Sequence, residues 1–162
     1  DAGAWHGRAF VGERLPTLVS VIDFCAAHAC RLNVEIKPAP GDAARTGRRV
    51  AEVLSVHRRA VPVLLSSFEP AALAAAAEVA ADLPRGLLLE TFRRGWMQEA
   101  RMLGCMAVIA ECAAWTPQTA AEAAAAGLRR LAYTVNDDAE AERLRALGLD
   151  GLITDRIDHF RP

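Results

Sequence analysis

The sequence contains the stretch Arg31–Pro38, RLNVEIKP, in which apolar and polar residues alternate. Its leucine, valine and isoleucine fall on one side, and its asparagine, Glu35 and Lys37 fall on the other. This two-residue period is typical of a β-strand, and the proline ends it because proline has no N–H to donate. Two charges at a strand end indicate either the solvated face of an antiparallel sheet or the mouth of a parallel α/β barrel.

The rest of the chain favours the parallel arrangement. Short apolar runs alternate with amphipathic or alanine-rich runs in six helix-then-strand units, which requires a parallel sheet covered by helices. No G-x-G-x-x-G motif follows the first strand, so a dinucleotide-binding sheet loses its main support. The expected helices are 16–29, 50–60, 70–82, 94–103, 117–126 and 138–147, and the expected strands are 31–37, 61–67, 87–90, 105–110, 130–135 and 151–155, with loops at 1–15 and 39–47 (the next helix could begin inside the second) and a turn at 84–86.

Polar side chains gather at the carboxyl ends of these expected strands. In a (β/α)8 barrel those ends meet at the face that carries the active site. The sequence therefore predicts an α/β fold, a TIM (β/α)8 barrel of which this chain holds six strands; an open sheet is the alternative. The strand-end residues are Glu35, Lys37, Ser66, Ser67, Glu90, Glu111, Asn136, Thr154 and Asp155.

Composition limits the function classes. The 162 residues suffice for one domain with a core, and we expect a single domain over 1–162. A formal net charge of −1 gives no electrostatic case for nucleic acid or for an anionic membrane surface. No apolar run approaches the length of a membrane span, and no signal peptide is visible. Because the chain opens without Met, a missing N-terminus is also considered.

The four cysteines form no C-x-x-C motif, so we expect reduced, buried thiols in a cytoplasmic protein. Cys25 and Cys30 fall in one expected helix, and a metal cluster of these two with His28 has no standard zinc spacing. Lys37 is the only lysine, whereas Arg is used everywhere else. It indicates either a site that needs a compact ammonium group or chance.

Five stretches of this sequence resemble, in the same order along the chain, the motifs of the glycerophosphodiester phosphodiesterases. The stretch 84–89, PRGLLL, is similar to the bacterial cytosolic branch tied to glycerol-3-phosphate uptake. The resemblance covers essentially the whole chain. Its five motifs are 12–18 (GERLPTL), 32–38 (LNVEIKP), 66–68 (SSF), 133–136 (YTVN) and 148–155 (GLDGLITD).

The resemblance implies hydrolysis of glycerophosphodiesters to an alcohol and sn-glycerol 3-phosphate with one divalent cation, Mg²⁺ or Ca²⁺. It implies that Glu35 is a metal ligand and that Lys37 lies at the phosphate. Tyr133 stands where the family has Trp and would offer a ring face to the substrate. From their strand-end positions, Glu90 and Glu111 are further candidates for substrate binding.

The family's first motifs are absent from this sequence. Those are a strand with His-Arg, a Glu-x-Asp pair of metal ligands and a His-Asp pair, and the two histidines are its general acid and base. None of the four histidines here matches them, although His6 could approach the mouth from the opening loop. We therefore expect a domain that lacks its first two strands, and a chain that is inactive as given. The alternative is a binding or oligomerisation module whose open sheet edges pair with another copy or a partner.

Overall fold

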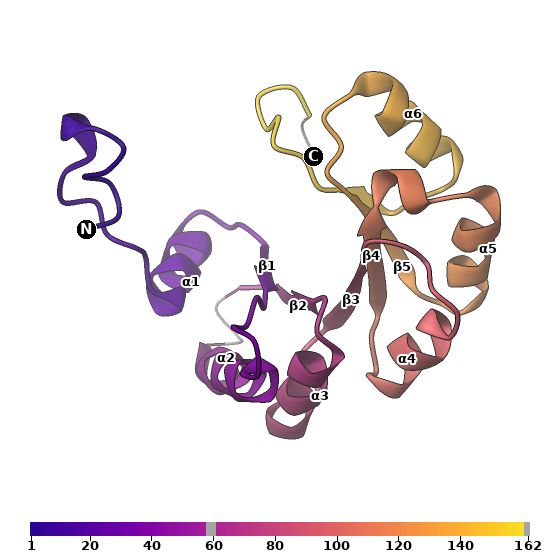
Figure 1. Cartoon of the computed structure of the whole chain (residues 1–162), viewed down its shortest axis with the longest axis horizontal. Coiled ribbons are helices and arrows are strands. Elements are labelled where there is room, and N and C mark those ends of the chain that lie inside the picture. The colour runs from indigo at the N-terminus through magenta and orange to yellow at the C-terminus, as the bar shows by residue number, and fades with distance from the viewer. Residues whose placement is uncertain (58–60, 161–162) are drawn as a thin grey trace.

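The computed structural model describes residues 1–57 and 61–160, and these build one parallel sheet in the order β1-β2-β3-β4-β5-β6. Each strand pairs with the next strand along the chain, in parallel, at every step from β1 to β6. Figure 1 shows that the sheet is an open arc rather than a closed barrel. The strands are β1 Leu32–Glu35, β2 Val63–Ser67, β3 Arg85–Leu89, β4 Ala107–Glu111, β5 Arg129–Tyr133 and β6 Gly151–Leu152.

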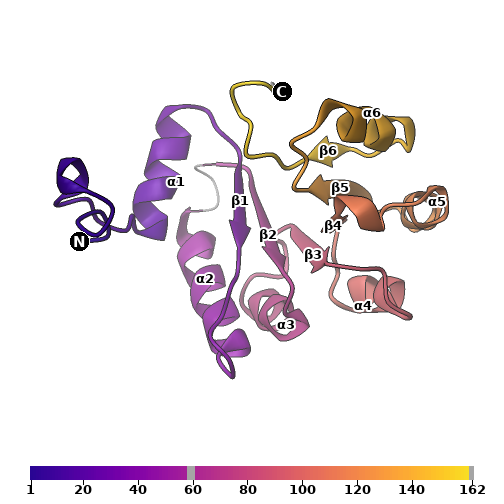
Figure 2. The same ribbon diagram turned by 45° about the horizontal axis from the view of Figure 1, so that its top comes forward.

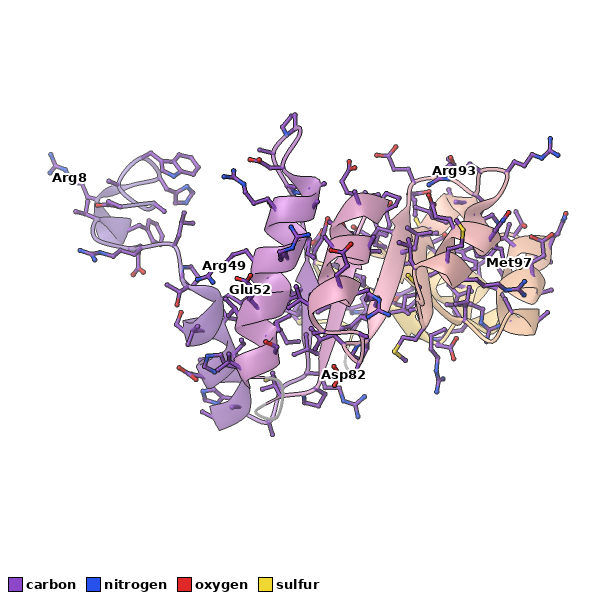
Figure 3. All side chains as sticks on the ribbon, turned by 90° about the horizontal axis from the view of Figure 1, so that it is seen from below. Arg8, Arg49, Glu52, Asp82, Arg93 and Met97 are labelled. Carbon is purple, nitrogen blue, oxygen red and sulfur yellow. The ribbon has the colours of Figure 1, made fainter. Side chains whose placement is uncertain are left out.

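A helix precedes each strand, as the alternating pattern predicts. Figure 2 shows α2, α3, α4 and α5 along the outer side of the arc, so the opposite side of the sheet is its concave face. Figure 3 shows Arg49 and Glu52 on the solvent side of α2, where they form an ion pair of 3.0 Å. The helices are α1 Leu18–Ala27, α2 Ala43–His57, α3 Pro70–Val79, α4 Trp96–Met102, α5 Pro117–Ala125 and α6 Asp138–Ala146, with short 3-10 turns at η1 Arg8–Phe10 and η2 Cys112–Ala114.

The helix starts follow from local capping. The Thr17 side chain accepts a hydrogen bond from the N–H of Ser20 at the start of α1. Thr116 and Thr119 form a reciprocal capping box at the start of α5, and Asp137 caps α6 through the N–H of Glu140. These side chains satisfy N–H groups that have no partner within the helix, which fixes where each helix begins.

The apolar side of the sheet packs against the helices in two clusters. Ile36, directly after β1, and Leu65 of β2 are buried with residues of α1, α2 and α3. Leu87, Val108 and Trp115 lie in a second cluster beneath α4, α5 and α6. Because side chains alternate along a strand, the residues between these positions point to the concave face, and this alternation aims the strand-end residues into the mouth.

Most boundaries differ from the prediction by a few residues, and β6 is shorter, at Gly151–Leu152 rather than 151–155. Helix α2 begins at Ala43, inside the stretch 39–47, which was the alternative to a loop there. Gly47 lies where this helix meets α3, and a Cβ there would stand 2.1 Å from the carbonyl oxygen of Ala72. Strand β3 includes Arg85, which was expected in a turn. Cys30 lies beyond α1 and is exposed, and Cys105 and Cys112 are half-buried, so the expectation of buried thiols holds for Cys25 alone among the four. The expected helix end at 58–60 lies outside the described residues.

The opening segment is held by its own polar contacts. The Asp1 carboxylate accepts hydrogen bonds from the N–H groups of Gly3, Ala4 and Gly12. The His6 ring packs edge-on against Phe10, with ring centroids 5.0 Å apart. Figure 1 shows that α1 lies between this segment and the sheet, and Figure 3 shows Arg8 in the segment. His6 is therefore not at the mouth. Among the described helices, none has the length and apolarity to cross a membrane.

We expect Gly47→Ala to lower the free energy of unfolding by roughly 1–3 kcal/mol, because the new methyl group would overlap the backbone of α3. This sign opposes the gain in helix propensity that alanine normally brings. Urea unfolding followed by circular dichroism measures the change. Gly7→Ala is the control, since its added methyl group meets nothing closer than 3.9 Å. An equal or smaller loss for Gly47→Ala would contradict the close helix contact.

Candidate active site

The two charges of β1 lie together at the mouth. Ile36, between them, is buried among the helices, so Glu35 and Lys37 both point to the concave side. The Lys37 ammonium nitrogen lies 3.3 Å from a Glu35 carboxylate oxygen, and the two side chains are 77% and 34% exposed. An ion pair this open to water adds little to stability, so either group can change partners at small cost.

A serine pair at the end of β2 fixes the end of β1. The Ser67 hydroxyl donates to the carbonyl of Ile36 at 2.7 Å and accepts from the N–H of Glu69 at 3.0 Å. The N–H of Ile36 donates to the carbonyl of Ser66 at 2.7 Å. Ile36 is thereby held through both of its backbone groups, and the charged residues on either side of it are fixed in place. The Ser66 hydroxyl itself has no partner among the described residues.

Tyr133 joins the ends of three strands. It ends β5, its hydroxyl donates to the carbonyl of Leu89 on β3 at 3.0 Å, and its ring meets Phe68 beyond β2 edge-on at 5.9 Å. Burial raises the pKa of the Tyr133 phenol to about 12, and the nearby charges of Glu90, Glu111 and Glu35 add to the shift. The carboxylates of Glu35, Glu90 and Glu111 are therefore near enough to act on one phenol.

The other two predicted carboxylates differ in their surroundings. Glu111 accepts hydrogen bonds from the N–H of Ala113 at 2.8 Å and from the Cys112 thiol at 3.2 Å, so its carboxylate caps η2. Burial, followed by the hydrogen bond to Glu111, raises the pKa of the Cys112 thiol to about 11. Glu90 is exposed and lines a hollow of about 300 Å³ with Phe68. Glu90 is thus open to a ligand, whereas Glu111 is engaged locally.

The polar residues at the ends of β5 and β6 bind one another. Asn136 accepts from the Thr154 hydroxyl and from the N–H of Asp155, both at 3.0 Å, and its amide donates to the Asp155 carboxylate at 3.1 Å. Through these hydrogen bonds Asn136 and Asp155 tie together the loops that follow β5 and β6.

The contacts of two arginines near β3 were not predicted from the sequence. Arg85 is buried, and its guanidinium donates to the carbonyls of Leu83 at 2.8 Å and Leu103 at 2.9 Å. Arg93 follows the other end of β3, where it pairs with Glu99. Figure 3 shows Arg93 at the upper edge of the molecule and Asp82 at the lower edge, so the residues before and after β3 lie on opposite sides. An arginine beside a turn signal is no sign of burial, so the pattern around Arg85 could not reveal its role.

The described residues do not fit a complete divalent-cation site. Mg²⁺ and Ca²⁺ take about six or more oxygen ligands, several of them carboxylates. No group of three His, Cys, Asp or Glu residues in the described part of the chain is placed to hold a metal ion. The one carboxylate expected as a ligand, Glu35, is paired with the Lys37 ammonium.

We expect the phenol of Tyr133 to ionise with a midpoint near pH 12 in the folded chain. The chain contains a single tyrosine, so ultraviolet absorbance of the phenolate reports on this residue alone. Because the folded pKa lies above the unfolded value of about 10, this group's contribution to stability is complete below about pH 10 and is lost as the pH rises to about 12. Glu90→Gln is expected to lower the midpoint, and Glu78→Gln, on α3, is the control. A midpoint near 10 in the folded protein would contradict this environment.

Comparisons with known proteins agree with this geometry. Residues 1–159 match the model of the glycerophosphoryl diester phosphodiesterase family. Similar proteins include glycerophosphodiester phosphodiesterases of Caldanaerobacter subterraneus subsp. tengcongensis, 28% identical over 96% of this chain and 64% of that protein, and of Bacillus subtilis, 27% identical over 99% of this chain and 60% of that protein. Among solved structures, an Oleispira antarctica phosphodiesterase in complex with the product sn-glycerol-3-phosphate is 30% identical, with a TM-score of 0.85 over 94% of this chain and 62% of that chain.

The chain thus spans about three fifths of the length of these relatives. Its six parallel strands form part of a (β/α)8 barrel, which confirms the predicted fold. The motifs around Glu35 and Tyr133 indicated the same family from sequence. This chain belongs to the glycerophosphoryl diester phosphodiesterase family.

Proposed function

We propose that this chain supplies the phosphate-binding part of an enzyme that hydrolyses glycerophosphodiesters to an alcohol and sn-glycerol 3-phosphate. The observation that carries the proposal is the pair of Glu35 and Lys37 at the mouth, 3.3 Å apart and open to solvent. Lys37 presents a compact ammonium group whose partner in the described structure is Glu35. A phosphodiester anion entering the mouth offers this ammonium a second, stronger hydrogen-bond acceptor.

In the proposed reaction, water or the glycerol 2-hydroxyl attacks phosphorus, and the bond from phosphorus to the alcohol breaks. The second route passes through a cyclic phosphate, which water then opens. Lys37 donates a hydrogen bond to a non-bridging oxygen and offsets the charge that develops there. The reaction also needs groups that remove a proton from the attacking oxygen and deliver one to the leaving alcohol.

The described histidines do not supply that acid–base pair. His28 and His57 lie at the C-terminal ends of α1 and α2, and His159 is bonded to Asp138 at 2.7 Å. None of the described histidines contacts Glu35 or Lys37. We therefore propose that residues 1–162 alone do not catalyse the reaction at the rate of the complete enzyme.

Further roles at the mouth remain proposals. We propose that the ring of Tyr133 and the carboxylate of Glu90 contact the substrate, because both lie at the mouth and Glu90 is exposed. A substrate contact by Glu111 would require it to leave η2. A cation, Mg²⁺ or Ca²⁺, with Glu35 as one ligand stays a prediction from family resemblance, because the described donors do not complete such a site. A cytoplasmic location likewise stays a prediction.

We expect Lys37→Met to weaken binding of sn-glycerol 3-phosphate to this chain by roughly tenfold or more, the value of one charge-assisted hydrogen bond. Lys37→Arg should recover only part of the affinity, since a planar fork replaces a compact ammonium group. Isothermal titration calorimetry measures the affinities. Arg31→Met removes the same charge at the opposite end of β1 and serves as the control. Unchanged affinity in Lys37→Met would refute phosphate binding by this residue.

A second candidate function is that of an oligomerisation module. The concave face carries an apolar trough of about 480 Å³ at the amino ends of the strands, lined by Leu32, Leu64, Met106 and Leu131 among others. The described part of the chain leaves one edge of β1 and one edge of β6 unpaired. An apolar face beside open strand edges favours association with a second copy.

This candidate predicts a concentration-dependent dimer. Light scattering after gel filtration should show the mass of two chains at high concentration, and Leu131→Glu should shift the protein to the monomer because it places a charge in the trough. Glu52→Gln, on the solvent side of α2, should leave the dimer unchanged. A monomer at every concentration would exclude this function.

A further inference from the structure

Ser66 is a buried polar residue whose hydroxyl makes no hydrogen bond to the described residues. It is 0% exposed, and its hydroxyl has no hydrogen-bond partner among residues 1–57 and 61–160. Burying an unpaired hydroxyl costs stability, so native proteins rarely do so without a reason. Its neighbour Ser67 is equally buried but has two hydrogen bonds. The two adjacent serines therefore make a natural comparison.

The strand register places a carboxylate residue beside Ser66 on its side of the sheet. In the register of the parallel strands, Ser66 lies between Glu35 on β1 and Gly86 on β3. Gly86 has no side chain, and the Ile109 side chain lies 3.0 Å from where a Cβ would be. Residues in register on parallel strands point to the same face, about 4.8 Å apart. The Ser66 hydroxyl and the Glu35 carboxylate therefore share the concave face as direct neighbours.

Backbone hydrogen bonds hold this pair in register. The carbonyl of Ser66 accepts the N–H of Ile36 at 2.7 Å, and the Ser67 hydroxyl donates to the carbonyl of the same residue, also at 2.7 Å. The backbone of Glu35, next to Ile36, is held beside Ser66 by these bonds. In the structure its carboxylate is paired with Lys37, yet a carboxylate has about four acceptor sites and can take another donor.

We propose that Ser66 is a positioning residue that donates its hydroxyl hydrogen to Glu35 when Lys37 turns to a substrate phosphate. The phosphate step rests on the proposed function, whereas the exchange of donors on Glu35 rests on the geometry alone. The Glu35 side chain is 34% exposed, so without a second protein donor only water would replace the ammonium at its carboxylate. With the Ser66 hydroxyl as donor, the Glu35 carboxylate keeps a hydrogen-bond partner and its position, which lowers the free-energy cost of separating Lys37 from Glu35.

A double-mutant cycle tests the exchange without any ligand. Ser66→Ala in the native chain should leave the urea midpoint unchanged or raise it, because it removes a hydroxyl that has no partner. In the Lys37→Met background the hydroxyl already serves Glu35, so Ser66→Ala should lower the midpoint. Ser67→Ala is the matched control and should lower the midpoint equally in both backgrounds, because its partners do not involve Lys37. An equal effect of Ser66→Ala in both backgrounds would overturn the proposal.

The ligand arm uses sn-glycerol 3-phosphate as the probe. Ser66→Ala should weaken its binding by roughly tenfold, the worth of one hydrogen bond to a charged group, and Ser66→Cys, with a weaker donor of similar size, should fall between Ser66→Ala and the native chain. Equal affinity for all three overturns the coupling to phosphate. No binding even to the native chain would refute the proposed function, and the ligand-free cycle would then decide the exchange by itself.

Discussion

The hydrogen bonding of one residue, Ile36, to β2 holds the candidate site together. Both of its backbone groups are bonded to the serine pair at 2.7 Å, and its side chain is buried beneath the helices. Burying an isoleucine contributes about 1.5–3 kcal/mol, far more than the exposed pair of Glu35 and Lys37. The core therefore sets the direction of this strand end, and the two charges follow from the alternation of side chains. Function here depends on an apolar anchor between two polar residues.

Much of the fold could be predicted because its signals are local. The alternation in Arg31–Pro38 and the helix starts expected at 117 and 138 need only neighbouring residues, and all appear in the structure. Features that depend on distant partners could not be predicted. Gly47 resembles a loop residue until α3 is placed beside it, and Arg85 resembles a turn residue until its carbonyl partners are known.

The candidate site follows the same division. Strand-end positions nominated Glu35, Lys37, Glu90 and Glu111, and the family resemblance added Tyr133. In the structure the charges of Glu35, Glu90 and Glu111 act on the Tyr133 phenol, and Lys37 pairs with Glu35. The sequence could not show that Glu111 is engaged by η2 or that Tyr133 reaches across to β3. These contacts depend on loop conformation. They matter chemically because three carboxylates in the mouth repel a phosphate anion, which places the demand for attraction on Lys37.

The strand order has a consequence for folding. Every strand pairs with its successor in the chain, so each pairing closes a loop of only about 20 to 30 residues, and no strand waits for a distant partner. Helix α3 supplies Ala72 and Ala76 to one apolar cluster and Leu73 to the other, which links neighbouring units without a shared centre. Such a chain resembles a stack of repeats, whose stability is a sum of nearest-neighbour interfaces. Assembly can then proceed unit by unit along the chain, and the loss of a terminal unit removes one interface rather than the whole core.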